Sequence, residues 1–134
     1  DPDTTYRANL HAMVLEARAI GAEAVFVTPP PNFIAAEDGL HVRRPNGLEG
    51  YVSAMRAQAS DDGVAVVELH PTLMDDYDQL GIQLARALYS YEVSPGVPDL
   101  SHFSRKGAIH AAETIVSQLA SASPSLAAYL LTAP

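Results

Sequence analysis

The residues best able to do chemistry are Asp99 and His102, in the segment Pro98-Asp99-Leu100-Ser101-His102-Phe103-Ser104. An Asp three residues before a His, at the start of a helix, can fold its carboxylate back onto the imidazole. In a Ser-His-Asp triad such a carboxylate fixes the imidazole tautomer, and the imidazole removes the proton of a serine hydroxyl. Taken alone, the short spacing favours a plainer interpretation, in which Asp99 is a turn residue and His102 a polar residue on a solvated loop.

Two nearby hydroxyls could be proposed as the partner of His102. Ser104 stands directly before an amphipathic stretch, where a serine is favoured as a helix cap and its oxygen accepts backbone N–H groups. Ser101 is too close along the chain to present an oxygen to a ring that also faces Asp99. The sequence therefore predicts that neither serine is a nucleophile.

Arg43 and Arg44 form a pair of adjacent cations within a long stretch rich in Pro, Asn and Gly. Guanidinium groups offer a fork of donors that matches carboxylates, so the pair could bind an acidic carbohydrate. The alternative is a solvated pair on the loop of an acidic protein. The sequence leaves both open.

Two further candidates are weaker. Asp75, Asp76 and Asp78 suggest a calcium loop. Leu80, however, occupies a position that needs an oxygen ligand and Ala87 replaces the closing Glu, so a solvated acidic helix start is expected. His70 follows an apolar run and either lines the site or is a satisfied loop histidine. No metal and no cofactor are expected.

Composition limits the possible partners. The 134 residues suit one domain, and 48% of them are hydrophobic, as in globular proteins. A formal charge of −8 argues against nucleic acid and anionic membranes, which need concentrated Lys and Arg. The sequence has no Cys, which excludes disulfides and a Cys nucleophile. No apolar run approaches the ~20 residues of a membrane span.

The hydrophobic pattern predicts helices alternating with two short strands. Continuous apolar runs are typical of strands buried on both faces, as in parallel sheets. The expected helices are 3–20, 46–62, 72–80, 81–91 and 105–120, and the expected strands are 24–28 and 64–69. The helical spacing assigns Met13 and Ile20 to the inner face of the first helix, and Ile109 and Val116 to that of the last.

Two parallel strands cannot form a stable sheet alone, because their outer edges expose unpaired backbone groups. The sequence therefore predicts further strands from elsewhere and looks like the carboxyl-terminal half of a sheet protein. We expect one domain portion over residues 1–123 and a terminal tail over 124–134.

The order of these features resembles the second half of the SGNH (GDSL) hydrolases, and most of all the rhamnogalacturonan acetylesterase branch. The matching segments are Val-Thr-Pro-Pro-Pro-Asn, Tyr-Val-Ser-Ala-Met, Val-Ala-Val-Val-Glu-Leu and Asp-Leu-Ser-His-Phe-Ser-Arg-Lys-Gly-Ala. The resemblance implies a flavodoxin-like α/β fold, a three-layer α/β/α sandwich around a parallel sheet of about five strands, present here as an incomplete half. It also implies that Asp99 and His102 complete a Ser-His-Asp triad.

The sequence departs from the family in its missing nucleophile. Gly-Asp-Ser, the Gly-x-Asn-Asp segment and the alternative Gly-x-Ser-x-Gly elbow do not occur in it. The missing half is the same half that the strand edges require, so we expect a separate or preceding portion to carry the serine.

The resemblance implies a carboxylic ester hydrolase that removes acetyl groups from carbohydrate, such as a pectic polysaccharide, and that is secreted if this substrate is correct. The 134 residues by themselves are expected to be inactive. The alternatives are a non-catalytic module that self-associates through its sheet edges, and an esterase of the same fold that acts on lipid or small acyl esters.

Overall fold

The computed structural model describes residues 1–42, 47–90 and 92–130. Helices make up most of the described chain. In chain order the elements are η1 (Pro2–Tyr6), α1 (Arg7–Ala19), β1 (Val25–Val27), α2 (Glu49–Asp62), β2 (Ala65–Val67), α3 (Leu69–Leu80), α4 (Ile82–Arg86), β3 (Glu92–Ser94), β4 (Val97–Pro98), α5 (Arg105–Ala122) and α6 (Pro124–Leu130).

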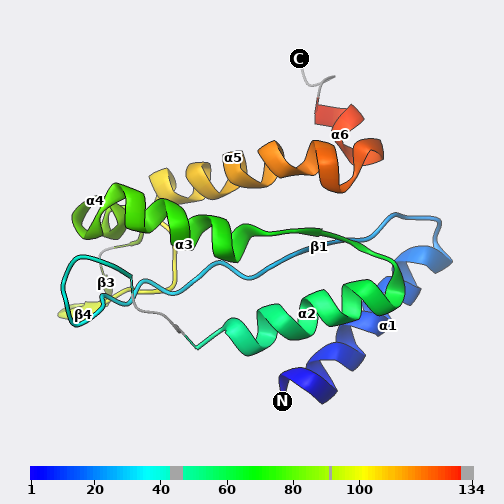
Figure 1. Ribbon diagram of the computed structural model, residues 1–134, viewed down its shortest axis with the longest axis horizontal. Helices are drawn as coiled ribbons and strands as arrows, with labels where there is room; N and C mark the ends of the chain where they lie inside the picture. The colour runs from blue at the N-terminus through cyan, green and yellow to red at the C-terminus, as the bar shows by residue number, and fades with distance from the viewer. Residues whose placement is uncertain (43–46, 91, 131–134) are drawn as a thin grey trace.

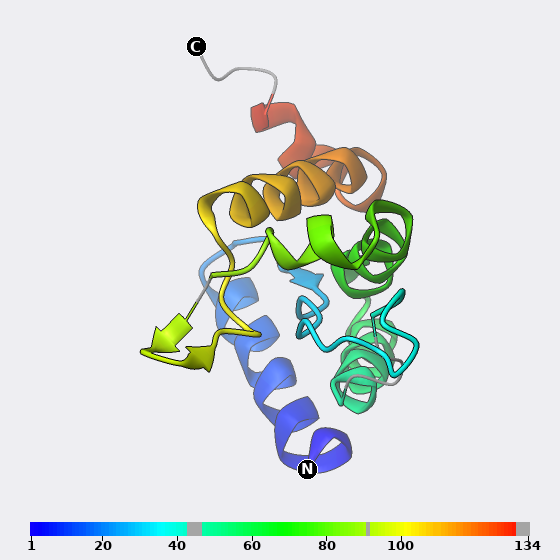
Figure 2. The ribbon, with the colours of Figure 1, turned by 90° about the vertical axis from the view of Figure 1, so that its left-hand side faces the viewer.

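Strands β1 and β2 lie side by side and parallel, with Val25 opposite Ala65 and Val27 opposite Val67. Helix α2 connects them, as a parallel pair requires. Helices α1 and α2 lie on one side of the strands, and α5 lies on the other (Figures 1 and 2). The expected fold class, an incomplete α/β/α arrangement with a parallel sheet, is confirmed.

The two faces of the strand pair belong to two different apolar clusters, because successive strand residues point to opposite faces. Phe26 packs with Leu10, Val14, Met55 and Ala59 from α1 and α2. Its neighbour Val27 packs against the larger cluster on the other face, which α3, α4 and α5 help to build. Burial on both faces is why the strands read as continuous apolar runs rather than alternating ones.

The edge of β1 that faces away from β2 has no strand beside it among the described residues. A second, two-stranded antiparallel unit, β3 with β4, forms a hairpin just ahead of Asp99. The sequence predicted a loop there, because Pro and Gly mark turns and the strands are very short.

Several expected helix faces are wrong. In α1, Leu10 and Val14 are buried, whereas Met13 and Ile20 are 61% and 83% exposed. In α5 the buried residues are Gly107, Ala111 and Thr114, whereas Ile109 and Val116 are about half exposed. Each helix carries apolar residues on more than one face. In this chain, only the face that contains the buried residues packs against a neighbouring element.

Helix boundaries follow local chemistry. Gly63 ends α2 in the left-handed conformation, with φ 60°, as the Asp-Asp-Gly exit predicted. The expected cap Asn46 lies outside the described residues. Helix α3 begins at Leu69 rather than at Thr72, so Asp75, Asp76 and Asp78 lie along its second half and not at its start. No helix among the described residues has the length and apolarity to cross a bilayer.

The carboxyl-terminal segment is tied to the α1–β1 connection. The Ser123 hydroxyl, which is buried, donates a hydrogen bond of 2.6 Å to Glu23, and Ser125 donates to the same carboxylate. Helix α6, where the sequence predicted a turn or a frayed tail, follows directly after Ser123. These hydroxyls hold the pKa of Glu23 below its usual value, and so favour the charged carboxylate.

Candidate active site

Asp99 and His102 contact one another. Nδ1 of His102 lies 3.1 Å from Oδ2 and 3.2 Å from Oδ1 of Asp99. The Asp99 side chain is only 6% exposed, whereas the His102 side chain is 77% exposed. A buried carboxylate therefore holds one ring nitrogen of an imidazole whose other nitrogen faces outward.

Backbone groups fix the Asp99 carboxylate before it meets the ring. The backbone N–H groups of His102 and Ser101 both donate to Oδ1, at 2.8 and 3.0 Å. These two bonds, with the nearby imidazole, lower the pKa of Asp99 below its usual value. The carboxylate is therefore charged at neutral pH and accepts Nδ1–H from His102, which leaves Nε2 as the reactive nitrogen of the neutral ring.

Backbone hydrogen bonds from residues 87–90 position the segment that carries His102. The carbonyl of His102 accepts from the backbone N–H of Ser90 at 2.8 Å, and the N–H of Ser104 donates to the carbonyl of Leu88 at 2.9 Å. Tyr89 and Phe103 form an antiparallel bridge between these bonds. The site thus lies between the end of the α4 region and the start of α5.

The loop that follows β1 supports the same segment. The N–H of Phe33 donates to the carbonyl of Leu100 at 2.8 Å, and the Ser101 hydroxyl donates to Oδ1 of Asn32 at 2.9 Å. The buried Tyr89 hydroxyl donates to the carbonyl of Pro31. Since this loop leaves the carboxyl end of β1, the Asp99–His102 pair lies at the sheet edge where open α/β folds bind ligands.

Contacts between Asp and His are frequent in this chain, so proximity alone does not mark a site. Among the described residues, His11 also pairs with Asp62 (2.7 Å), His41 with Asp38 (2.7 Å) and His110 with Asp76 (3.0 Å). Asp62 ends α2 directly before β2, and so belongs to the amino end of the strands; Asp38 and His41 are both exposed. Two backbone N–H groups also fix Asp38, those of Leu40 and His41, but its side chain is 48% exposed. Asp99 differs in that its backbone-fixed side chain is only 6% exposed.

The two nearby serine hydroxyls have other partners. The Ser104 hydroxyl donates to the Ala87 carbonyl at 3.0 Å and accepts from the Gly107 N–H at 3.2 Å, so Ser104 is the cap of α5, as predicted. The Ser101 hydroxyl is bonded to Asn32. Neither geometry is that of a nucleophile that donates to His102.

The remaining candidate residues do not join the Asp99–His102 site in the described part of the chain. Arg43 and Arg44 lie outside the described residues, so their role stays a prediction. His110 of α5 pairs with Asp76 of α3, and Asp78 accepts a bond of 3.3 Å from the Val42 N–H. No group of three or more His, Cys, Asp or Glu within 1–42, 47–90 and 92–130 is arranged to hold a metal ion.

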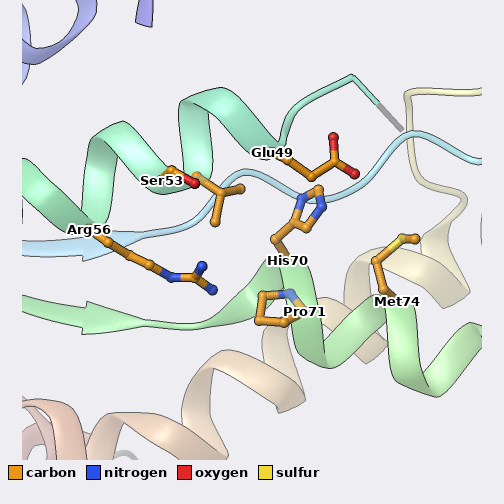
Figure 3. Close-up of a pocket in the computed structure, with 7 residues that line it drawn as sticks. Glu49, Ser53, Arg56, His70, Pro71 and Met74 are labelled. Atoms are coloured by element: carbon orange, nitrogen blue, oxygen red, sulfur yellow. The ribbon is translucent and has the colours of Figure 1, made fainter. Parts of the chain in front are cut away.

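His70 is buried and lines a cavity of about 530 Å³ between α2 and the first turn of α3 (Figure 3). Sequence reasoning left His70 as either a site-lining residue or a satisfied loop histidine, and it did not single out Glu49, Ser53 and Arg56, which line the same cavity. Nothing in the local pattern marks them, because they face the cavity only once α2 packs beside α3.

The parallel strand pair between helical layers, with an Asp–His pair leading into the last long helix, is the arrangement expected from the resemblance to the second half of the SGNH hydrolases. Comparisons with known proteins agree. The chain is 28% identical over 116 residues to the probable rhamnogalacturonan acetylesterase YesY of Bacillus subtilis (strain 168), which covers 86% of this chain and 50% of YesY. The predicted resemblance to this branch is confirmed, and the chain spans about half the length of that relative.

A solved structure supports the fold. The crystal structure of the Bacillus subtilis protein YxiM superposes with a TM-score of 0.71 at 20% identity, covering 87% of this chain and 31% of that one. The chain matches no protein-family model.

Proposed function

We propose that this chain supplies the Asp and His of a Ser-His-Asp esterase that removes acetyl groups from carbohydrate. The observation that carries the proposal is the Asp99 carboxylate, fixed by two backbone N–H groups and in contact with Nδ1 of His102, whose ring is otherwise exposed. This is the arrangement that a general base needs: one nitrogen oriented, the other accessible.

The proposed steps follow from that orientation. Nε2 of His102 takes the proton of a serine hydroxyl as the serine oxygen attacks the acetyl carbonyl. Nε2 then gives that proton to the departing sugar oxygen, which leaves an acetyl-serine. Water, deprotonated by the same nitrogen, attacks this ester; the bond to the serine oxygen breaks, Nε2 returns its proton to that oxygen, and acetate leaves. Asp99 stabilises the imidazolium at each transfer without taking its proton.

The serine is proposed to come from outside these 134 residues. Three observations support this: the nearby Ser101 and Ser104 hydroxyls have other partners, Gly-Asp-Ser does not occur, and the chain spans half of YesY. Loss of the nucleophile from such a unit costs on the order of 10⁶-fold in turnover. The 134 residues alone are therefore expected to be almost inert.

The substrate proposal rests on YesY, whose name specifies a rhamnogalacturonan acetylesterase. An acetylated pectic polysaccharide carries carboxylates, and the Arg43–Arg44 pair is proposed to bind them. An enzyme with this substrate would act outside the cell.

The test compares two proteins. The first is the 134-residue chain; the second is the longer product translated from the coding sequence upstream of Asp1. Acetate release from acetylated rhamnogalacturonan is expected only from the longer product, and His102→Ala should lower it by about 10⁴-fold or more. The matched control is His110→Ala, which breaks another Asp–His pair and should leave the rate unchanged.

Two results would contradict the proposal. One is an upstream sequence without a Gly-Asp-Ser; the other is full hydrolysis by the His102→Ala variant. Activity on long-chain acyl esters without activity on acetylated polysaccharide would retain the triad but overturn the substrate.

A further inference from the structure

The cavity beside His70 has the chemistry of a binding site. It lies between α2 and the start of α3, holds about 530 Å³ and falls within the size range of small-ligand pockets. Its polar side chains are Glu49, Ser53, Arg56 and His70, and its apolar ones are Val52, Pro71 and Met74. Figure 3 shows the labelled side chains converging on the space between the two helices.

His70 is held in one orientation. Its backbone N–H donates to the Thr28 hydroxyl at 2.9 Å, and its Nδ1 lies 2.9 Å from the Pro29 carbonyl oxygen. A carbonyl only accepts, so Nδ1 carries the hydrogen and the neutral ring presents Nε2 as an acceptor. The ring is 5% exposed overall and lines the cavity, so this acceptor is directed at whatever occupies it.

The charge of the cavity disfavours anions. Among the described residues that line it, the cation Arg56 is engaged by both oxygens of Glu68, at 2.6 and 2.8 Å. The Glu49 carboxylate accepts the N–H of Gly47 at 2.9 Å, and His70 adds an acceptor. A cation held by its own carboxylate, beside a directed acceptor, suits a ligand that brings hydrogen-bond donors and no negative charge.

The apolar lining completes the match to a sugar. Met74 and Val52 are buried, and with Pro71 they offer a surface for C–H or methyl groups. A neutral sugar, above all a deoxy sugar with a methyl group, presents hydroxyl donors on one side and such groups on the other.

We propose that this cavity binds a neutral sugar unit of the polysaccharide chain, an inference that rests on the proposed function. The segment from Pro29 to Asn32 contacts His70 at one end and Ser101 at the other. Three residues of backbone span at most about 11 Å. One carbohydrate chain can therefore occupy the cavity and extend toward the Asp99–His102 pair.

The test measures binding on the 134-residue chain itself, which needs no catalytic serine. Methyl α-L-rhamnoside and trigalacturonate are titrated separately while backbone amide signals are followed by NMR. The rhamnoside is expected to shift the signals of Ser53 and His70 saturably, with a Kd in the millimolar range, and trigalacturonate is expected to leave them in place.

Two variants locate the site. His70→Asn keeps a donor for the Pro29 carbonyl but removes Nε2, and Ser53→Tyr fills the mouth of the cavity from an exposed helix position; each should weaken binding at least tenfold. Ser60→Tyr is the matched control, since Ser60 is exposed two turns further along α2 and does not line the cavity. It should bind as well as the unmodified chain.

Binding of trigalacturonate in preference to the rhamnoside would overturn the proposal, as would unchanged binding by the Ser53→Tyr variant. The outcome is independent of the esterase assay. An active longer enzyme whose cavity binds no sugar refutes this site alone, whereas sugar binding by a chain whose His102 is dispensable refutes the proposed catalytic function and keeps the site.

Discussion

Gly107 in α5 approaches the carbonyl of Leu88 so closely that a Cβ at position 107 would lie 1.8 Å from that oxygen. The contact exists because Leu88 also accepts the N–H of Ser104, which presses the start of α5 onto residues 87–88. His102 lies in the segment that this junction closes. A glycine at position 107 therefore allows α5 to start close to Leu88, and this close approach fixes the segment that carries His102.

Gly107→Ala is predicted to destabilise the fold by about 1–3 kcal/mol, the usual cost of overpacking, although alanine is the better helix former. Urea unfolding measures this change. The control is Gly50→Ala in α2, where the new Cβ meets only Pro2 at an ordinary 3.5 Å. That variant should be neutral or stabilised by up to about 1 kcal/mol. Equal stability of the two variants would show that the Leu88 contact is not tight.

Tyr89→Phe is predicted to cost about 1–3 kcal/mol of unfolding free energy, because it leaves the buried Pro31 carbonyl without its donor. Tyr77→Phe should cost less, since the Tyr77 hydroxyl bonds only to Tyr89, at 3.0 Å. Burial raises the pKa of Tyr77 to about 12 and also raises the pKa of Tyr89, so both hydroxyls stay protonated in the pH range of the assay. Thermal unfolding distinguishes the two variants; a larger loss from Tyr77→Phe would contradict the assigned roles.

The sequence could predict what local chemistry determines. Continuous apolar runs identified β1 and β2, Ser104 was recognised as a cap, and the Asp-x-x-His spacing placed a carboxylate beside an imidazole. Each depends on residues near one another in the chain.

It could not predict what depends on packing between distant segments. Met13 and Ile109 have the spacing of core residues, but which of two apolar faces packs depends on neighbours that the periodicity of one helix does not specify. The cavity beside His70 exists only where α2 meets α3, and its lining comes from positions about 20 residues apart. The β3–β4 hairpin is too short to produce an alternating pattern.

Asp99 should contribute to the acid sensitivity of the fold, beside Asp38, Asp62 and Glu23, whose pKa values are also lowered. Its pKa is lowered from an ordinary 3.8, first by the N–H of His102 and then by that of Ser101. A carboxyl whose pKa is lower in the folded state stabilises the fold above its unfolded pKa, and this contribution is lost as pH falls through the folded value. The stability difference between the unmodified chain and Asp99→Asn should therefore be constant from pH 7 to about pH 5 and shrink below about pH 4.

Urea unfolding at several pH values checks this prediction. His102→Ala is the informative control, since it keeps both backbone N–H donors and removes only the ring. It should retain most of the acid dependence. If Asp99→Asn in the His102→Ala background produced a stability difference that no longer varied with pH in this range, the effect would belong to the imidazole instead.

The exposed apolar faces of α1 and α5 provide the last prediction. Met13 and Ile109 are 61% and 49% exposed. If the proposed serine-bearing portion exists, we expect it to cover them. Met13→Gln and Ile109→Gln should change the stability of the 134-residue chain by less than about 0.5 kcal/mol, because neither side chain is buried in it. The double variant should bind a separately expressed serine-bearing portion at least tenfold more weakly, measured by calorimetry. Unchanged affinity, with unchanged acetate release from the mixture, would show that this portion docks elsewhere.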